Sequence, residues 1–154
     1  MPQDSDYETS KGLAYKNYKE TQQIYCPYLK TKISFSSDGF RHLVYKGGGK
    51  KRDEESQLMR FTLLEKAREV LSITTTLQEY QSESREMLVE EHEQKVSKIV
   101  TVVYFGFIAI IENWKFKVIV KQIGKGRPFF WSVIPNWRTR NKERIMFKGN
   151  LEEG

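Results

Sequence analysis

The feature that most constrains the fold is a change of hydrophobic periodicity near Val96. Before this point apolar residues recur at the spacing of amphipathic helices, and after it they alternate or run continuously as in β-strands. Three such runs follow one another at residues 99–111, 116–121 and 129–134. Because the helices come first and the strands second, the pattern predicts an α+β fold, with N-terminal helices packed on a C-terminal antiparallel β meander.

The connections between the three runs support a meander. Glu112-Asn113 is a tight polar turn, and residues 124–128 (Gly-Lys-Gly-Arg-Pro) form a glycine-rich hairpin loop. Pro135 follows the last run and is expected to end the sheet, because proline has no amide hydrogen to donate to a neighbouring strand.

Capping residues and glycines delimit two helices in the N-terminal half. Residues 32–35 alternate like a short strand, and residues 36–38 (Ser-Ser-Asp) can cap a helix that ends at the triple glycine 47–49. Asp53 can cap a longer helix with apolar residues at helical spacing, which the three threonines at 74–76 are expected to break.

Length and composition favour one folded domain. A chain of 154 residues that is 38% hydrophobic can bury one core. Residues 1–30 have sparse apolar positions and are predicted to be a polar lead-in segment, followed by the domain over 31–148 and a tail over 149–154. Within the domain, the acidic residues 77–92 predict a further, thinly apolar helix.

Positive charge is concentrated late in the sequence. The formal net charge is +6, but residues 115–148 carry ten basic residues and one acidic residue, a local charge of +9 that leaves −3 for the remainder. This uneven field favours a polyanionic partner such as a nucleic acid.

Few residues suit metal or thiol chemistry. Cys26 is the only cysteine, and His42 and His92 lie too far apart for a zinc-finger or HExxH motif, so neither a metal nor another cofactor is expected. Residues 1–10 lack the apolar stretch of a secretory signal, and the apolar run 99–111 is too short to span a bilayer. These features predict a cytoplasmic protein that does not associate with membranes.

His42 is the main candidate for proton transfer, because histidine exchanges protons near neutral pH. It precedes the loop 47–52 (Gly-Gly-Gly-Lys-Lys-Arg), whose amides and cations could bind a phosphate, although the loop lacks the P-loop pattern. The alternatives are a helix-surface or half-buried structural histidine and a flexible solvent loop. Arg60, on the long predicted helix, faces either the sheet or the solvent.

The predicted sheet carries a basic face. Alternation places Lys115, Lys117 and Lys121 on one side of their strand. On the next strand, alternation places Trp131 and Ser132 on opposite faces, and Ser132 is a lone hydroxyl that could contact a phosphate or a neighbouring strand. Cations beside aromatic rings are typical of surfaces that bind RNA phosphates and stack on RNA bases.

Residues 32–137 resemble the phage and mobile-element branch of the barnase/EndoU/colicin/RelE ribonuclease superfamily. The resemblance is carried by Phe40-Arg41-His42-Leu43 with the downstream Arg52, and by residues 116–121 and 130–135. It implies a small metal-independent endoribonuclease, often a toxin, in which helices pack on a twisted antiparallel sheet. RNA is then the expected substrate, and an antitoxin or immunity protein is an expected partner.

The resemblance also implies roles for particular residues. His42 would be the acid or base, Arg52 and Lys121 the cations at the phosphate, and Ser132 a polar contact. The ribose 2′-hydroxyl would attack and leave a 2′,3′-cyclic phosphate, with Tyr45, Lys46 or another cation as the second proton-transfer group. The residues expected to bind RNA are Lys46, Lys50, Lys51, Arg60, Lys117, Trp131 and Arg138.

Two other functions fit the same sequence. The first is a non-catalytic nucleic-acid-binding module, favoured by the basic stretch and by Trp131 and Trp137. The second is a protein-interaction domain, in which the acidic residues 77–92 would contact a basic partner.

Overall fold

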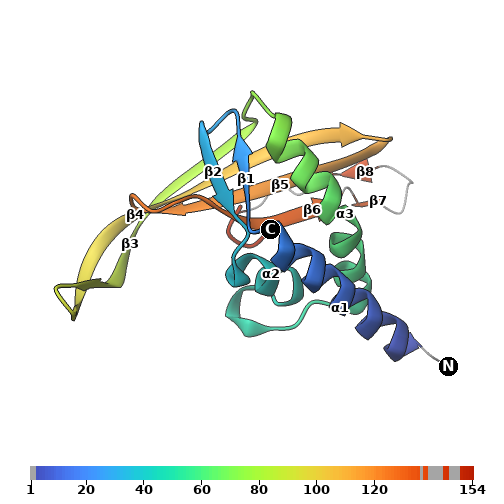
Figure 1. Cartoon of the computed structure of the whole chain (residues 1–154), viewed down its shortest axis with the longest axis horizontal. Coiled ribbons are helices and arrows are strands. Elements are labelled where there is room, and N and C mark those ends of the chain that lie inside the picture. The colour runs from blue at the N-terminus through green and yellow to red at the C-terminus, as the bar shows by residue number, and fades with distance from the viewer. Residues whose placement is uncertain (1–2, 136, 139–143, 146–149) are drawn as a thin grey trace.

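The computed structural model describes residues 3–135, 137–138, 144–145 and 150–154, with side chains described over 6–135 and 150–154. Helices precede a meander formed by the last long strands, so the predicted α+β fold is confirmed (Figure 1). In chain order the elements are α1 (Gln3–Thr21), β1 (Gln23–Cys26), β2 (Thr31–Ser34), α2 (Ser37–Val44), the 3-10 turn Gly47–Gly49, α3 (Glu54–Ile73), β3 (Glu79–Glu91), β4 (Gln94–Ile111), β5 (Trp114–Ile123), β6 (Phe129–Pro135), β7 (Trp137–Arg138) and β8 (Arg144–Ile145).

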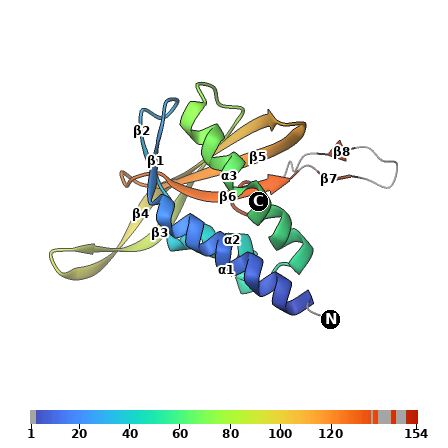
Figure 2. The same cartoon turned by 45° about the vertical axis from the view of Figure 1, so that its right-hand side comes forward.

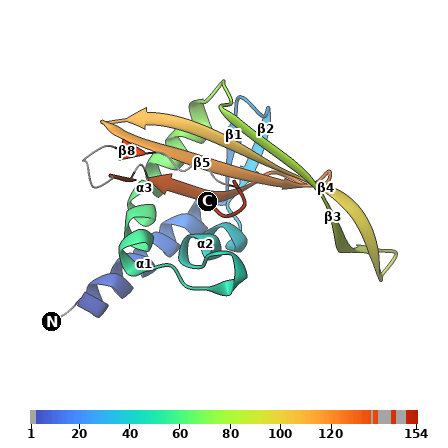
Figure 3. The ribbon, with the colours of Figure 1, turned by 180° about the vertical axis from the view of Figure 1, so that it is seen from behind.

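Within the described residues, the main sheet has the strand order β1-β2-β6-β5-β4-β3. Its neighbouring strands are antiparallel except for β2 and β6, which run parallel where Ser34 lies opposite Phe129. Glu112 and Asn113 both have positive φ, as a two-residue hairpin turn requires, so the predicted turn between β4 and β5 is confirmed. The hairpin of β3 and β4 extends beyond the other strands (Figure 1 and Figure 3).

The sheet has two faces with different coverings. On the first face, side chains of β4, β5 and β6 pack under the helices, and α3 lies against the sheet with α1 packed on α3 (Figure 2). Residues of this core include Leu43, Phe61, Leu64, Phe107, Phe116, Val118, Val120, Phe130 and Val133. The second face carries a smaller cluster of Val102, Tyr104, Ile119, Ile134 and Leu151. Among the described residues, no helix has both the length and the apolar character needed to cross a membrane.

The prediction of an acidic helix over residues 77–92 is wrong, because this segment forms β3. Its residues pair continuously with β4 from Glu79 opposite Gly106 to Glu91 opposite Gln94. Alternate side chains of β3 are half-buried and exposed, which is the period of a strand. The helical interpretation failed because the segment has few apolar residues, and its strand form is stabilised by hydrogen bonds to β4, the next strand, across the turn at His92 and Glu93.

Residues 1–30 form more structure than a polar lead-in. They contain α1 and β1, and two tyrosines of α1 are buried: the hydroxyl of Tyr7 bonds to Gln57, and that of Tyr18 donates to the main-chain oxygen of Ser36 over 2.6 Å. Helix α1 has no strong apolar stripe, so the sequence pattern does not predict it. Packing of a few aromatic rings on α2 and α3 supplies the stability that the pattern lacks.

Candidate functional site

His42 and Arg52 are positioned by α2 and by the glycine loop that precedes α3. Asp53 caps α3, accepting from the Ser56 amide over 2.7 Å, as predicted. Before it, Gly48 and Gly49 adopt positive φ values of 81° and 79°, which glycine tolerates and which fold the chain back on itself. The Arg52 amide consequently donates to the main-chain oxygen of Val44 over 2.8 Å, so Arg52 lies beneath the end of α2.

Arg52 is bonded to His42 in two ways. Its Nε donates to the main-chain oxygen of His42 over 3.0 Å, and its Nη2 lies 3.2 Å from His42 Nε2. Because a guanidinium has only donors, Nε2 accepts this bond and the imidazole proton resides on Nδ1. His42 is therefore held neutral and oriented by Arg52.

A β-bulge in β6 positions the next two residues. Ile119 of β5 pairs with Ser132, while the following Val120 pairs with Phe130, so Trp131 is the extra residue. The predicted alternation of Trp131 and Ser132 is wrong here, because a bulge turns both side chains toward the second face. There the Trp131 Nε1 donates to the Glu152 main-chain oxygen over 2.9 Å, and Ser132 Oγ donates to that of Gly154 over 3.0 Å.

One main-chain oxygen accepts hydrogen bonds from three side chains that are far apart in the sequence. The Gly154 oxygen accepts from Arg52 Nη2 over 2.9 Å, from Arg60 Nη1 over 3.0 Å and from Ser132 Oγ over 3.0 Å. Arg60 also donates to Ser132 Oγ over 2.9 Å, so α3 and β6 are linked at this point. The two guanidiniums and the hydroxyl have the geometry of an oxyanion-binding site.

Trp131 joins His42 and Lys121 to the same site. The His42 ring stacks on Trp131 with 4.2 Å between ring centroids and 19° between planes. Lys121 Nζ lies 4.1 Å from the Trp131 centroid, within the range of a cation–π contact. We call His42, Arg52, Arg60 and Lys121 the basic cluster; all four side chains are buried.

Two cavities open beside the basic cluster. One of about 550 Å³ is lined by α2, the glycine loop, β5, β6 and residues 152–153, and includes His42, Lys121 and Trp131. The other, of about 460 Å³, is lined by Lys46, Gly47, Arg52, Arg60, Ile134, Glu153 and Gly154. Both volumes fall in the range of small-ligand sites.

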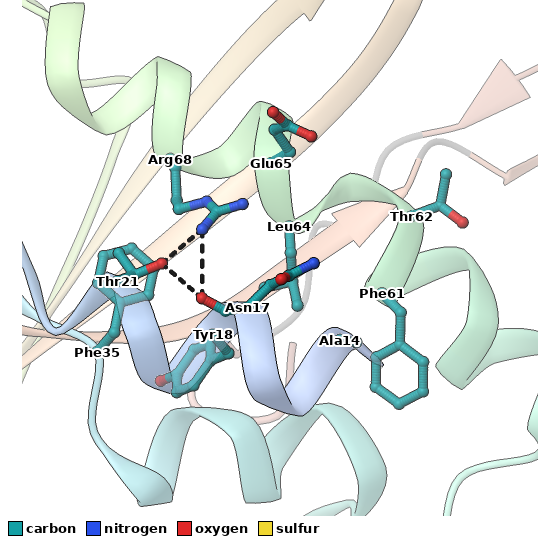
Figure 4. A pocket seen from close by; sticks show the side chains of 10 residues that line it. All are labelled: Ala14, Asn17, Tyr18, Thr21, Phe35, Phe61, Thr62, Leu64, Glu65 and Arg68. Atoms are coloured by element: carbon teal, nitrogen blue, oxygen red, sulfur yellow. Dashed lines mark hydrogen bonds between the residues drawn. The ribbon is translucent and has the colours of Figure 1, made fainter. Parts of the chain in front are cut away.

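A third cavity lies between α1 and α3 and is only about 100 Å³ (Figure 4). Arg68 closes it by donating to Thr21 Oγ1 over 2.5 Å and to the Asn17 main-chain oxygen over 3.4 Å (Figure 4). This cavity is too small for a nucleotide, and Arg68 serves there to join two helices.

Burial dominates the electrostatics of the basic cluster. Desolvation, together with Arg52 and Arg60, lowers the pKa of His42 to about 3. Desolvation and the nearby Arg52 lower the pKa of Arg60 to about 9, and desolvation also lowers the pKa of Arg52 and of Lys121. Among the described residues, none of Arg52, Arg60 and Lys121 has an Asp or Glu side chain within ion-pair distance. A bound anion would relieve this excess of buried positive charge.

The structure brings together several of the residues predicted from sequence. The residues that meet at the site are His42, Arg52, Arg60, Lys121, Trp131 and Ser132, with Lys46 at the cavity wall. Lys50 and Lys51 are exposed, and Lys51 Nζ lies 5.3 Å from the Tyr7 ring centroid instead. The side chain of Arg138 lies outside the described residues.

Lys117 lies in a packed part of the sheet rather than on the predicted open basic face. It is fully buried and its Nζ lies 2.6 Å from Glu79 Oε1. Ile119, between Lys117 and Lys121 on the same face, is also fully buried, so this part of the face is packed rather than open to RNA.

Sequence reasoning missed the contribution of residues 150–154, which were predicted to be a tail. Leu151 is buried in the cluster on the second face, and Glu152 and Gly154 accept hydrogen bonds from site residues. The available signal was Leu151 itself, a lone apolar residue in a polar segment.

Comparisons of the chain with protein-family models, with curated proteins and with solved structures found no match.

The pKa of His42 predicts a measurable dependence of stability on pH. The unfolded chain protonates His42 near pH 6.5, whereas the folded chain does so only near pH 3. Its contribution to the free energy of unfolding is therefore complete above pH 6.5 and is lost as the pH falls. Between pH 7 and pH 4 this loss is about 3 kcal/mol.

The measurement is urea unfolding at both pH values, for the wild-type chain and for His42→Phe. Phenylalanine keeps a ring against Trp131 but cannot be protonated, so the variant should lose about 3 kcal/mol less than the wild type. Equal losses in the two proteins would show that His42 does not titrate as its burial dictates.

Proposed function

We propose that this chain is an endoribonuclease that cleaves RNA through attack of the ribose 2′-hydroxyl, without requiring a metal ion. The single observation that carries the proposal is that Arg52, Arg60 and Ser132 all donate to one oxygen, that of Gly154, while His42 and Lys121 contact Trp131 beside them. The participating side chains come from α2, the loop before α3, α3, β5 and β6. The resemblance to the ribonuclease superfamily selects His42, Arg52, Lys121 and Ser132 from the sequence alone.

The geometry supports a role for each group. A phosphate oxygen placed where the Gly154 oxygen lies would receive bonds from Arg52, Arg60 and Ser132. These donors would stabilise the negative charge that grows on the phosphate as the 2′-oxygen bonds to phosphorus. Lys121 adds a further positive charge beside Trp131.

Cleavage also needs two proton transfers: one removes the 2′-hydroxyl proton, and the other supplies a proton to the 5′-oxygen as its bond to phosphorus breaks. His42 lies beside Arg52, one of the donors to the Gly154 oxygen, and the negative phosphate would raise the pKa of His42 toward neutral pH. Tyr45 and Lys46 line the same cavity as His42 and are the candidates for the second transfer.

The test is cleavage of single-stranded RNA in excess EDTA. The wild type should release products that end in 2′,3′-cyclic phosphate, and His42→Ala should lower the rate by about 10²–10⁴-fold while keeping the far-UV circular dichroism of the wild type. The matched control is His92→Asn, at the exposed turn between β3 and β4, where asparagine accepts the positive φ of 48°. Undiminished cleavage by His42→Ala would refute the assignment.

A second candidate function is RNA binding without cleavage. It is favoured by one observation: His42 Nε2 already accepts a bond from Arg52, and burial lowers its pKa to about 3, which disfavours proton transfer in this arrangement. A binding module would leave RNA intact but bind it in a salt-sensitive way. Three buried cations neutralising three phosphates give a slope of log K against log salt of about −2.

A further inference from the structure

Residues 150–154, which we call the strap, lie across the candidate site beside β6 (Figure 3). Its last residue provides the oxygen bound by Arg52, Arg60 and Ser132. Its Glu152 main-chain oxygen takes the Trp131 indole proton. The strap therefore occupies the donors that the proposed function assigns to an RNA phosphate.

The strap is anchored outside the basic cluster, on the hairpin of β3 and β4. Gln81 Oε1 accepts from the Leu151 amide over 2.8 Å, and Gln81 Nε2 donates to Asn150 Oδ1 over 2.7 Å. Glu152 Oε2 lies 2.6 Å from Arg85 Nη2, and both side chains are about one-third exposed. Leu151 fills the apolar cluster on the second face. Gln81, Arg85 and Leu151 line neither of the two cavities beside the basic cluster, whereas Glu152 lines the cavity that includes His42.

The strap supplies no acidic side chain to Arg52 or Arg60. Both guanidiniums donate to the main-chain oxygen of Gly154, and among the described residues no Asp or Glu side chain lies within ion-pair distance of either. The two cavities beside the cluster share Lys46, Gly47 and Glu153 in their walls, so the strap lies between them. Its departure would join them into one groove along Arg52 and Arg60.

We propose that the strap is a built-in competitor of RNA, whose Gly154 oxygen occupies the phosphate-oxygen site and must leave before RNA binds. This inference rests on the proposed function in that the competing ligand is an RNA phosphate. The apparent affinity for RNA is then the affinity of the open molecules multiplied by the fraction of molecules whose strap is open. Weakening the strap's anchor should therefore tighten RNA binding.

The test compares two charge reversals in the strap, Glu152→Lys and Glu153→Lys. Both change the net charge equally, but only Glu152 lies against Arg85, whereas Glu153 is exposed. The probe is a fluorescent 2′-O-methyl oligoribonucleotide, which cannot be cleaved, and the readout is anisotropy. Glu152→Lys should bind about two- to fivefold more tightly than Glu153→Lys, the effect of losing one partly exposed ion pair.

Deletion of residues 150–154 is the second variant. If the strap is closed in nine-tenths of molecules, deletion should tighten binding of the same oligonucleotide by about tenfold. Equal binding by the two charge reversals, or weaker binding by Glu152→Lys, overturns the proposal. If the deletion prevents folding, the pair of charge reversals still decides the question.

A parallel assay with unmodified RNA separates this proposal from the proposed function. If the wild type does not cleave RNA but Glu152→Lys binds the methylated probe more tightly than Glu153→Lys, the strap competes and the nuclease assignment fails. If the wild type cleaves RNA and the two reversals bind alike, the nuclease assignment stands and the competing strap is refuted.

Discussion

Replacing Arg60 with methionine is expected to lower the rate of RNA cleavage by about 10²–10³-fold, the effect of removing one donor from an oxyanion site. Arg60 Nη1 bonds to both Ser132 Oγ and the oxygen of Gly154. Methionine keeps much of the volume of the arginine stem but removes the charge and all its donors. The measurement is single-turnover cleavage of a defined oligoribonucleotide.

The same substitution should cost little stability. Arg60 is 5% exposed and has no Asp or Glu side chain within ion-pair distance among the described residues, and burial lowers its pKa to about 9. Folding must therefore desolvate a cation that only neutral acceptors and a main-chain oxygen meet, so its removal offsets the loss of its hydrogen bonds. We expect the free energy of unfolding to change by about 1 kcal/mol or less.

Arg68→Met is the matched control, because it removes the same charge from the same helix. Arg68 bonds to Thr21 and Asn17 of α1, away from the basic cluster (Figure 4). The control should cleave RNA at the wild-type rate. If Arg60→Met and Arg68→Met retain equal activity, Arg60 has no part in binding the phosphate.

Gly39→Ala is expected to destabilise the protein by about 3 kcal/mol, the upper range of overpacking a core. Gly39 lies in α2, which packs closely on β6. A Cβ at this position would lie 2.2 Å from the main-chain oxygen of Phe130 and 2.5 Å from the Tyr18 hydroxyl. The first atom belongs to the sheet backbone, so α2 must move away from β6. Because α2 carries His42, cleavage should fall as well.

Gly12→Ala is the control for the helical preference of alanine. Gly12 lies in α1, and its Cβ would meet nothing within 4 Å. This substitution should stabilise the protein by up to about 1 kcal/mol. Urea unfolding of both variants measures the contrast. Similar unfolding midpoints for the two would show that α2 can shift on β6 at little cost.

Local rules predicted the elements whose signals are contained in short stretches of sequence. Asp53 caps α3 because its carboxylate reaches the Ser56 amide three residues later. Glu112 and Asn113 turn the chain because two polar residues between apolar runs accept positive φ. The α+β order followed from the change of periodicity alone.

Where the pairing of two strands decides the structure, the signal within one segment was misleading or absent. Residues 79–91 form a strand because β4 lies beside them, and their own composition resembles an exposed helix. The bulge at Trp131 depends on the register between β5 and β6, so simple alternation assigned Trp131 and Ser132 to opposite faces. Neither feature can be obtained from periodicity, because each depends on two strands at once.

The sequence by itself determined the chemical groups, the order of helices and strands, and the concentration of positive charge near its end. Tertiary structure alone decided that His42, Arg52, Arg60, Lys121 and Ser132 meet, that Lys117 pairs with Glu79, and that residues 150–154 cover the site. The reason is physical. Caps, turns and strand periods depend on atoms a few residues apart, whereas desolvation, pKa and hydrogen-bond geometry depend on which distant segments exclude water from a group.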